Sequence, residues 1–227
     1  LVPSAAYPTS VSPSAVLFSA SSQSLVVPST QLQTGDSVMV WSTVAHLNPA
    51  ELRKAGSSTP PRGPYLDLPA DLPATVAATA RQVTVGATNS YDQMLALQQW
   101  FRTHFEYDRT VQFGGGSGAI VDFLDAKRGF CQQFAATFAA MARTLGVPSR
   151  VGVGFTPGLL GSDGRYHVYG RHAPAWPEVW FDATAHREPT RRFSSSGNDS
   201  RRIENDSHSR YAAADRKSTR LNSSHIP

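Results

Sequence analysis

The stretch GFCQQFAATFAAMARTLGVPSRVGVGFTPG, residues 129–158, decides the fold of this chain. After its cysteine, four apolar residues recur at offsets that place them on one face of a helix: Phe134, Phe138, Met141 and Leu145. This spacing predicts an amphipathic helix with one buried stripe. Gly146 and Pro148 then end the helix, because glycine adopts the left-handed C-terminal conformation and proline cannot continue a helix.

Strands are expected after this helix. RVGVGFT (150–156) predicts one strand, and a turn rich in glycine follows it around GLLGSDGR (158–165). YHVYG (166–170) and AWPEVWF (175–181) predict two more strands. We expect these two to pair with each other in an antiparallel arrangement.

A second helix is predicted upstream, over NSYDQMLALQQWFRTHF (89–105). Ser90 followed by Gln93 has the spacing of a capping box. Four apolar residues share one face of this helix: Met94, Leu97, Phe101 and Phe105. A shorter alanine-rich helix is expected between Tyr65 and Val85.

Short apolar runs nearer the N-terminus predict a few strands: SAVLF (14–18), SLVV (24–27) and SVMVWSTV (37–44). In the rest of the chain, helices come first, then the cysteine helix, then strands. This order indicates an α+β fold, because a parallel α/β fold alternates its strands and helices.

Cys131 is the only cysteine and stands in the first turn of the predicted central helix. The helix dipole and the unpaired N–H groups of that turn favour a thiolate, and the same N–H groups are placed to act as oxyanion donors. A lone cysteine on a helix is also commonly an inert buried thiol. Position alone leaves both interpretations open, a reactive nucleophile and a structural cysteine.

The positive charge of the chain lies at one end. The formal net charge is +4, but residues 1–182 hold 12 Lys+Arg and 12 Asp+Glu, while residues 183–227 hold 9 and 5. The folded part therefore has no basic stripe, and a nucleic-acid partner is not expected. One cysteine and seven scattered histidines give no metal-ligand spacing, so neither a metal nor another cofactor is expected.

Composition divides the chain into three parts. Residues 1–63 are predicted to be a β-rich N-terminal segment, with a boundary at STPPRGP (58–64), and residues 64–182 hold the predicted core. Residues 183–227 contain nine serines, nine basic residues and a single phenylalanine. They bury too little apolar surface to offset chain entropy, so a disordered tail is expected.

Linked motifs in the core resemble the transglutaminase-like superfamily, in particular its bacterial membrane-anchored branch (TgpA type). Besides the cysteine helix and its strand, they are YDQMLALQQWFRTHFEYD (91–108), AIVDFLDAKRGFC (119–131) and YHVYGRHAPAWPEVWFD (166–182). The resemblance implies a papain-like α+β core with the cysteine helix packed on an antiparallel sheet. It also implies acyl transfer at amide bonds of a protein or peptide, through a Cys–His–acid triad with Cys131 as nucleophile.

A proline stands where the resemblance places the catalytic histidine. The branch has His-Ala-Trp, whereas this chain has Pro174 before its Ala-Trp. Proline has no titratable group and no backbone N–H, so it neither acts as a base nor donates to a sheet ladder. His172 shares a strand face with position 174 but lies roughly 6.5–7 Å away along the strand. It replaces the missing base only if the strand shifts by two residues.

The acid of the triad is also disturbed. The resemblance points to Glu188 in Glu-Pro-Thr (188–190), but the polar stretch ATAHR (183–187) replaces the apolar strand that should carry it. Asp182 is expected to belong to a turn. As written, the triad is broken and this chain is expected to be inactive.

The end of the sequence suggests a cause. DRKSTRLNSSHIP (215–227) resembles the conceptual translation of a sequencing adapter, and DATA (182–185) is what an Asp-Gly-Tyr-Gly codon run becomes when one base is dropped. Both predict a frameshift near residue 183 that leaves the core incomplete at its C-terminus. Histidine and proline codons differ by one base, so a sequence error and a genuine pseudoenzyme both account for Pro174.

Two functional hypotheses follow. The first is a fragment of a transglutaminase-like cysteine hydrolase or acyltransferase, and the second is a catalytically silent domain that binds peptide or a cell-envelope polymer. The chain begins at Leu1 without a start methionine, as a fragment does, and has no run of 18 apolar residues. The resemblance implies a parent anchored by membrane helices outside this sequence, with this domain outside the cytoplasm.

Overall fold

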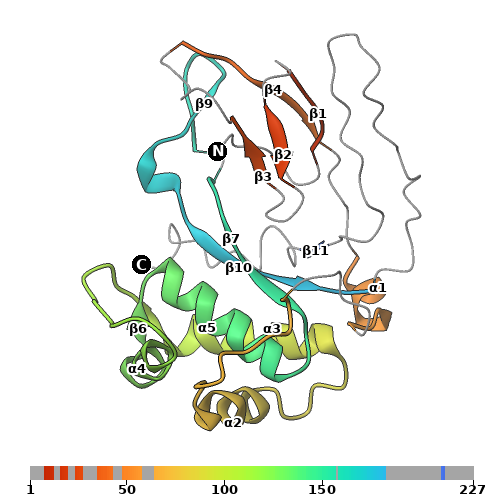
Figure 1. Ribbon diagram of the computed structural model, residues 1–227, viewed down its shortest axis with the longest axis vertical. Coiled ribbons are helices and arrows are strands. Elements are labelled where there is room, and N and C mark those ends of the chain that lie inside the picture. The colour runs from red at the N-terminus through yellow and green to blue at the C-terminus, as the bar shows by residue number, and fades with distance from the viewer. Residues whose placement is uncertain are drawn as a thin grey trace. The chain divides into compact units, whose positions relative to one another are not determined.

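The computed structural model describes residues 8–12, 16–19, 24–27, 35–42, 48–57, 64–156, 158–182 and 211–212 (Figure 1). Contacts divide the chain into two compact units. One unit comprises Leu1–His46 with Arg187–Ser209, and the other comprises Leu47–His186 with Arg210–Pro227. The predicted tail from residue 183 to 227 lies outside the described residues, apart from 211–212.

In its described residues, the first unit has two antiparallel strand pairs. Its strands are β1 (Pro8–Ser12), β2 (Leu17–Ser19), β3 (Ser24–Val26) and β4 (Met39–Ser42). β1 pairs with β4 and β2 pairs with β3. Val11, Val16 and Leu25 are buried together between them. The strands predicted from the three apolar runs are therefore present, and β1 is an additional one.

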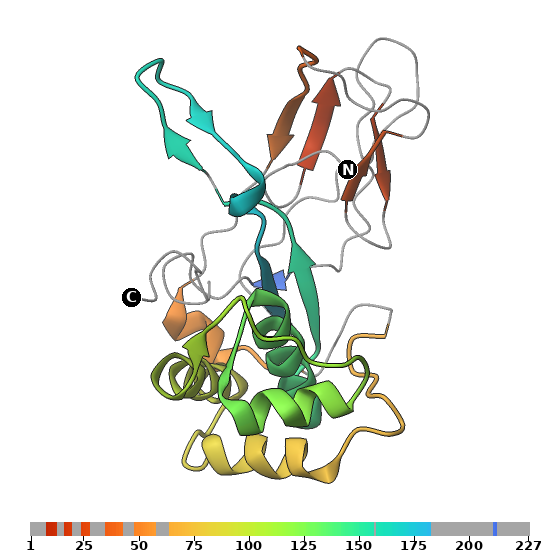
Figure 2. The ribbon, with the colours of Figure 1, turned by 90° about the vertical axis from the view of Figure 1, so that its left-hand side faces the viewer.

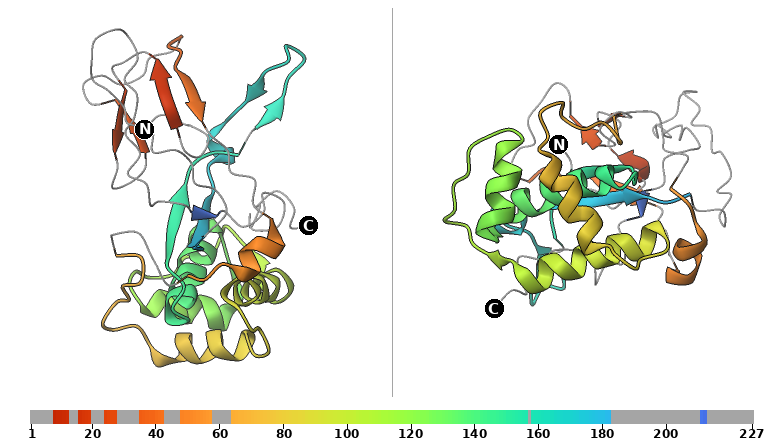
Figure 3. Two further views of the ribbon diagram at one scale, coloured as in Figure 1. Left: turned by 90° about the vertical axis from the view of Figure 1, so that its right-hand side faces the viewer. Right: turned by 90° about the horizontal axis from the view of Figure 1, so that it is seen from below.

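The second unit is built on helices that pack around a central one. The described helices are α1 (Pro49–Lys54), α2 (Ala74–Val83), α3 (Ser90–His104), α4 (Gly118–Ala126) and α5 (Cys131–Thr144). Helices α2, α3 and α4 each pack against α5 (Figure 3). Helix α1 packs against α3 and buries Leu52 in the same core. Residues before position 63 therefore contribute to this unit.

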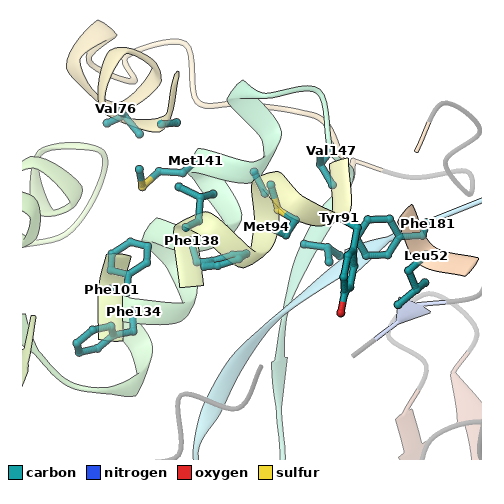
Figure 4. Packing of buried hydrophobic residues seen from close by; sticks show 14 of the residues in the cluster. Leu52, Val76, Tyr91, Met94, Phe101, Phe134, Phe138, Met141, Val147 and Phe181 are labelled. Atoms are coloured by element: carbon teal, nitrogen blue, oxygen red, sulfur yellow. The ribbon is translucent and has the colours of Figure 1, made fainter. Parts of the chain in front are cut away.

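The core centres on aromatic rings from three helices and the turn after α3. Phe134 of α5 lies 4.9 Å from Phe123 of α4 and 6.0 Å from Phe101 of α3, centroid to centroid, with both pairs edge to face. Phe105 lies 4.9 Å from Phe101. Figure 4 shows Phe101, Phe134 and Phe138 in this cluster. Edge-to-face contacts of this kind add to the stabilisation from apolar burial.

The predicted stripe of α5 is confirmed, with one change at its end. Phe134, Phe138 and Met141 are buried. Leu145 is the C-cap residue and packs partly buried against the core. Gly146 follows with φ of +78°, the left-handed conformation that ends a helix at glycine.

The capping box predicted at Ser90 and Gln93 is wrong by one residue. Asn89 is the N-cap of α3, and its Oδ1 accepts a hydrogen bond from the backbone N–H of Asp92 at 2.9 Å. Ser90 is the first helical residue, and its hydroxyl instead pairs with that of Ser57 at 2.9 Å. Asparagine and serine cap helices about equally well, so the sequence NS offers two starts of similar free energy.

The strands after α5 form one long interrupted hairpin. β7 (Ser149–Val153) pairs antiparallel with β10 (Ala175–Trp180). Nested between them, β8 (Leu159–Leu160) pairs with β9 (Tyr166–His167), and Figure 2 shows this inner hairpin projecting away from the helices. The predicted pairing of 166–170 with 175–181 is therefore wrong. The 3-10 turn η1 (Gly170–His172) separates the two segments and makes them consecutive parts of one arm.

The β7–β10 pair packs against α5 (Figure 1). The buried hydroxyl of Ser149 donates to the carbonyl of Ala139 on α5 at 2.8 Å, and Val179 is buried in the core opposite it. On its other edge, β10 pairs with β11 (Tyr211–Ala212). The cysteine helix thus packs on an antiparallel sheet, which confirms the predicted α+β architecture.

Gln98 gives a test of the helical core. Its side chain is buried on α3, and its Nε2 has no hydrogen-bond partner within the described part of the chain. Because an unpaired buried donor carries a desolvation cost, we expect Gln98→Met to leave the free energy of unfolding unchanged or raise it by about 1 kcal/mol. Urea denaturation measures this.

The control for Gln98→Met removes a buried polar group that is paired. Ser149→Ala deletes the hydroxyl bonded to Ala139 and should lower the free energy of unfolding by about 1 kcal/mol. A loss of 2 kcal/mol or more in Gln98→Met would show that its amide is paired in solution.

Candidate functional site

Cys131 is the first residue of α5, as predicted from the sequence. It carries a free thiol and is partly exposed. The chain enters the helix from β6 (Arg128–Gly129), which pairs parallel with β5 (Glu106–Tyr107). This short ladder ends with the N–H of Asp108 donating to the carbonyl of Gly129 at 2.7 Å. The two residues before Phe130 are therefore fixed by backbone hydrogen bonds.

Gly129 fixes the approach of the chain to the cysteine. A methyl group at this position would lie 2.9 Å from the Cδ2 and Cε2 atoms of Phe123. Phe123 is itself buried against the rings of α3 and α5. The start of α5 is therefore locked to the aromatic core, and a side chain at position 129 has no room.

The first turn of α5 presents backbone donors beside the thiol. Its first intrahelical bond is from Phe134 N to Phe130 O at 3.3 Å, so the N–H groups of residues 131–133 precede the helical ladder. Gln133 turns back, and its Oε1 accepts from Phe130 N at 3.1 Å. N–H groups of this kind suit the oxyanion of a tetrahedral intermediate formed at the sulfur.

Pro174 occupies a hydrogen-bonded position of the β7–β10 ladder. Beyond the strand ends, Gly154 N donates to Pro174 O at 3.3 Å and Thr156 N donates to His172 O at 2.9 Å. The register of β7 with β10 thus continues through residues 172–174. In such a pair each residue normally donates to the other. Proline lacks the N–H, so the reciprocal bond to the carbonyl of Gly154 is missing.

His172 ends the 3-10 turn with one ring nitrogen already engaged. Its Nδ1 accepts from the backbone N–H of Tyr169 at 3.0 Å, and its backbone N–H donates to Tyr169 O at 2.8 Å. An Nδ1 that accepts is unprotonated, so in the neutral ring Nε2 carries the proton. In this tautomer His172 has no free lone pair for a thiol proton. Among the described residues, no hydrogen bond joins His172 to Cys131.

The predicted acid Glu188 and the turn residue Asp182 are placed differently. Glu188 lies outside the described residues and stays a prediction. Asp182 follows β10, its Oδ1 accepts from the indole N–H of Trp180 at 2.8 Å, and its backbone N–H donates to Gly56 O at 2.6 Å. Asp182 thus fixes the end of the strand to the segment after α1.

One side-chain network on the β7–β10 pair was not predicted from the sequence. Arg150 and Glu178 form an ion pair across β7 and β10, and Glu178 also accepts from the indole of Trp176. The signal was available in two glycines at alternate positions of a strand, Gly152 and Gly154. Glycine weakens a strand interior, and its presence there often marks the close approach of another group.

Asp108, the residue that follows β5, has a lowered pKa. Hydrogen bonds from the Thr110 hydroxyl, at 2.6 Å, and from the Thr110 N–H, at 2.8 Å, lower the pKa of Asp108 below its ordinary value, and Arg128 adds a smaller attraction. Within the described ranges no cluster of three or more His, Cys, Asp or Glu side chains could hold a metal ion.

Comparison with known proteins identifies a family to which part of this chain is similar. Residues 77–188 match the family model described as transglutaminase-like superfamily. The Pseudomonas aeruginosa protein named protein-glutamine gamma-glutamyltransferase is 35% identical over 88 residues, which are 37% of this chain and 13% of that protein. The Bacillus subtilis protein YebA, described as uncharacterized, is 28% identical over 140 residues, 57% of this chain and 19% of that protein.

Among solved structures, the periplasmic domain of TgpA from Pseudomonas aeruginosa is similar, with 29% identity and a TM-score of 0.47. The similarity covers 52% of this chain and 42% of that domain. The chain spans less than a fifth of the length of each curated relative that it matches.

The contact between Gly129 and Phe123 predicts a size limit at position 129. Gly129→Ala should lower the free energy of unfolding by about 1–3 kcal/mol, because the added methyl group displaces a buried ring. Gly118→Ala is the matched control, since nothing lies within 4 Å of a methyl group there. It should be neutral or stabilising by up to about 1 kcal/mol, because alanine favours the helix. Equal effects of the two changes in thermal denaturation would contradict the proposed packing.

The hydrogen bonds from Thr110 predict a pH effect at Asp108. Because the folded pKa lies below the ordinary value, the stabilisation is present above that ordinary value and is lost as the pH falls through the folded pKa. Thr110→Val removes the hydroxyl donor, so the Asp108 pKa should rise towards its ordinary value. An NMR titration of the carboxyl carbon measures it. An unchanged Asp108 pKa would mean that the hydroxyl bond is not formed.

Proposed function

We propose that the chain, whose residues 77–188 match the transglutaminase-like superfamily, is part of a cysteine acyltransferase or hydrolase acting on amide bonds. The observation that carries the proposal is the position of Cys131 as the first residue of α5, with backbone donors of the first turn beside it. In this superfamily context a reactive nucleophile explains the cysteine better than an inert thiol does.

The reaction has two steps. The Cys131 thiolate attacks the carbonyl carbon of an amide, the C–N bond breaks, and the amine leaves with the proton taken from the thiol. An acyl thioester remains. A water molecule or a second amine then attacks the same carbon and releases the thiol, which gives hydrolysis or transfer respectively. N–H groups of residues 131–133 are proposed to bind the oxyanion in both steps.

A protein substrate is the preferred proposal for the acyl donor. The similar Pseudomonas protein is named for transfer of the γ-glutamyl group of protein glutamine. By analogy we assign a side-chain amide of a protein or peptide as the bond that Cys131 attacks. This assignment concerns the parent protein, because the matched part is a small share of that relative's length.

The chain as written lacks the base for this reaction, which favours a second candidate. Pro174 stands at the position where the superfamily resemblance places histidine, and His172 engages Nδ1 in its own turn. A catalytically silent domain that binds peptide or a cell-envelope polymer fits these two observations. For such a domain, iodoacetamide should label Cys131 no faster than a free thiol at the same pH.

An extracytoplasmic position is proposed for the parent, on the superfamily resemblance to the membrane-anchored branch. None of the helices in the described ranges combines the length and the apolar character needed to cross a membrane.

Restoring the base tests the enzymatic proposal. Pro174→His should create acyl-transfer activity on a glutamine-containing protein, measured as ammonia release or as incorporation of a fluorescent amine. General-base catalysis contributes typically 10²- to 10⁴-fold, so the gain over the unmodified chain should lie in that range.

Two controls separate chemistry from folding. Pro174→Ala restores the ladder N–H without a base and should remain inactive, and Pro174→His combined with Cys131→Ala should lose the gained activity. The enzymatic proposal is contradicted if a folded Pro174→His protein gains no acyl-transfer activity and iodoacetamide labels Cys131 slowly. That result would favour the silent domain.

A further inference from the structure

We propose that Trp176 is a positioning residue for the side chain at position 174, and that Arg150 and Glu178 hold its indole in place. The inference rests on the proposed function in one respect, since position 174 is where that function requires its base. The geometry that supports it is independent of any activity.

The indole of Trp176 fills the space over two residues of the neighbouring strand. A methyl group on Gly152 would lie 2.8 Å from indole Cε2 and Nε1, and one on Gly154 would lie 2.8 Å from indole Cη2. Gly152 is the cross-strand partner of Trp176, and Gly154 is the residue bonded to Pro174. The indole therefore extends from Gly152, the cross-strand partner of Trp176, to Gly154, the residue opposite Pro174.

Side chains at 174, 176 and 178 lie on the same face of this arm, because they alternate along an extended chain. The ladder bonds at Gly154 and Thr156 carry the register past the end of β10, so the alternation holds at position 174. A side chain there has the six-membered edge of the indole beside it, over Gly154. This edge limits the rotamers of a side chain at position 174. A histidine introduced there would therefore have its imidazole held in one orientation.

Glu178 fixes the orientation of the ring. Its Oε1 accepts from indole Nε1 at 3.0 Å, and its Oε2 accepts from Arg150 Nε at 2.6 Å. The Arg150 and Glu178 side chains are only 22% and 15% exposed. Charge-assisted bonds with little solvent are short and directional. The carboxylate thus uses one oxygen for the guanidinium and the other for the indole.

The two glycines give an independent reason to assign a role to this ring. Glycine in a strand interior costs stability, and here one lies within β7 and the second, Gly154, directly follows it. Both lie under the indole. The indole thus covers the residue opposite position 174 as well as its own cross-strand partner. The geometry assigns the ring to the neighbourhood of that position.

Glu178→Gln in the Pro174→His protein tests the assignment. The amide offers one acceptor where two are used, so either the indole or the guanidinium loses its bond. We expect kcat to fall roughly 10- to 100-fold with little change in KM, because misplacement of a catalytic group affects the transition state. The imidazole introduced at position 174 should also change its NMR titration midpoint, a measurement that needs no turnover.

Asp182→Asn is the matched control. Asp182 accepts from the indole of Trp180 at 2.8 Å with the same two-residue spacing, but Trp180 is not among the atoms that lie over the glycines. Asp182→Asn should leave both the titration midpoint and kcat as they are in Pro174→His. Trp176→Phe is the second variant, since it keeps an apolar ring and removes both the N–H and the reach to Gly154.

The outcomes separate this inference from the proposed function. If Pro174→His is inactive but Glu178→Gln still moves the titration of the new imidazole, the positioning role stands and the enzymatic proposal fails. If Glu178→Gln and Trp176→Phe both leave the titration midpoint, kcat and KM unchanged in folded protein, the positioning role is overturned. Circular dichroism establishes folding for each variant, and Trp176→Phe carries the test if Glu178→Gln does not fold.

Discussion

The backbone pairing of β7 with β10 sets the place of the candidate base relative to the cysteine helix. Hydrogen bonds run from Trp180 N to Pro148 O at one end of the pair and from Thr156 N to His172 O at the other. One face of the pair packs on α5, where the Ser149 hydroxyl reaches the helix backbone. A shift of register by one residue would turn every side chain of β10 to the opposite face. The position of residue 174 therefore depends on the register of the whole β7–β10 pair.

The cysteine takes its place from a different set of contacts. Phe123, Phe134 and Phe101 form an aromatic cluster that holds α3, α4 and α5 together. Gly129 brings the chain against Phe123 just before the helix begins. The two halves of the candidate site thus depend on different packing: an aromatic helical core for the thiol, and a sheet register for the base. A change in one half can leave the other intact.

The sequence predicts those parts of the fold that depend on local periodicity. The stripe of Phe134, Phe138 and Met141 and the glycine stop of α5 are of this kind, and they place Cys131 in the first turn. The cap of α3 was predicted one residue too late, because Asn89 and Ser90 are chemically similar starts. The partner of β10 was wrong for another reason. Alternation identifies strands, but pairing depends on the turn at Gly170–His172, whose 3-10 geometry has no strong sequence signal.

Side-chain networks were harder still to predict. The link from Arg150 through Glu178 to Trp176 joins residues 28 positions apart, and it becomes visible only when the register is known. The proposed roles of Cys131 and position 174 come from the resemblance, because periodicity alone left them open. Glu188 stays a prediction from that resemblance.

Pro174 has a consequence for local stability as well as for chemistry. The carbonyl of Gly154 lacks its reciprocal ladder bond, whereas the opposite end of the hairpin is fastened by bonds from Ser149 N to Tyr65 O and from Asp182 N to Gly56 O. Local opening should therefore cost least free energy around residues 154–156 and 172–174, and most near Pro148 and Trp180. The end of the sheet that bears the candidate base can open and reclose while the helical core stays folded.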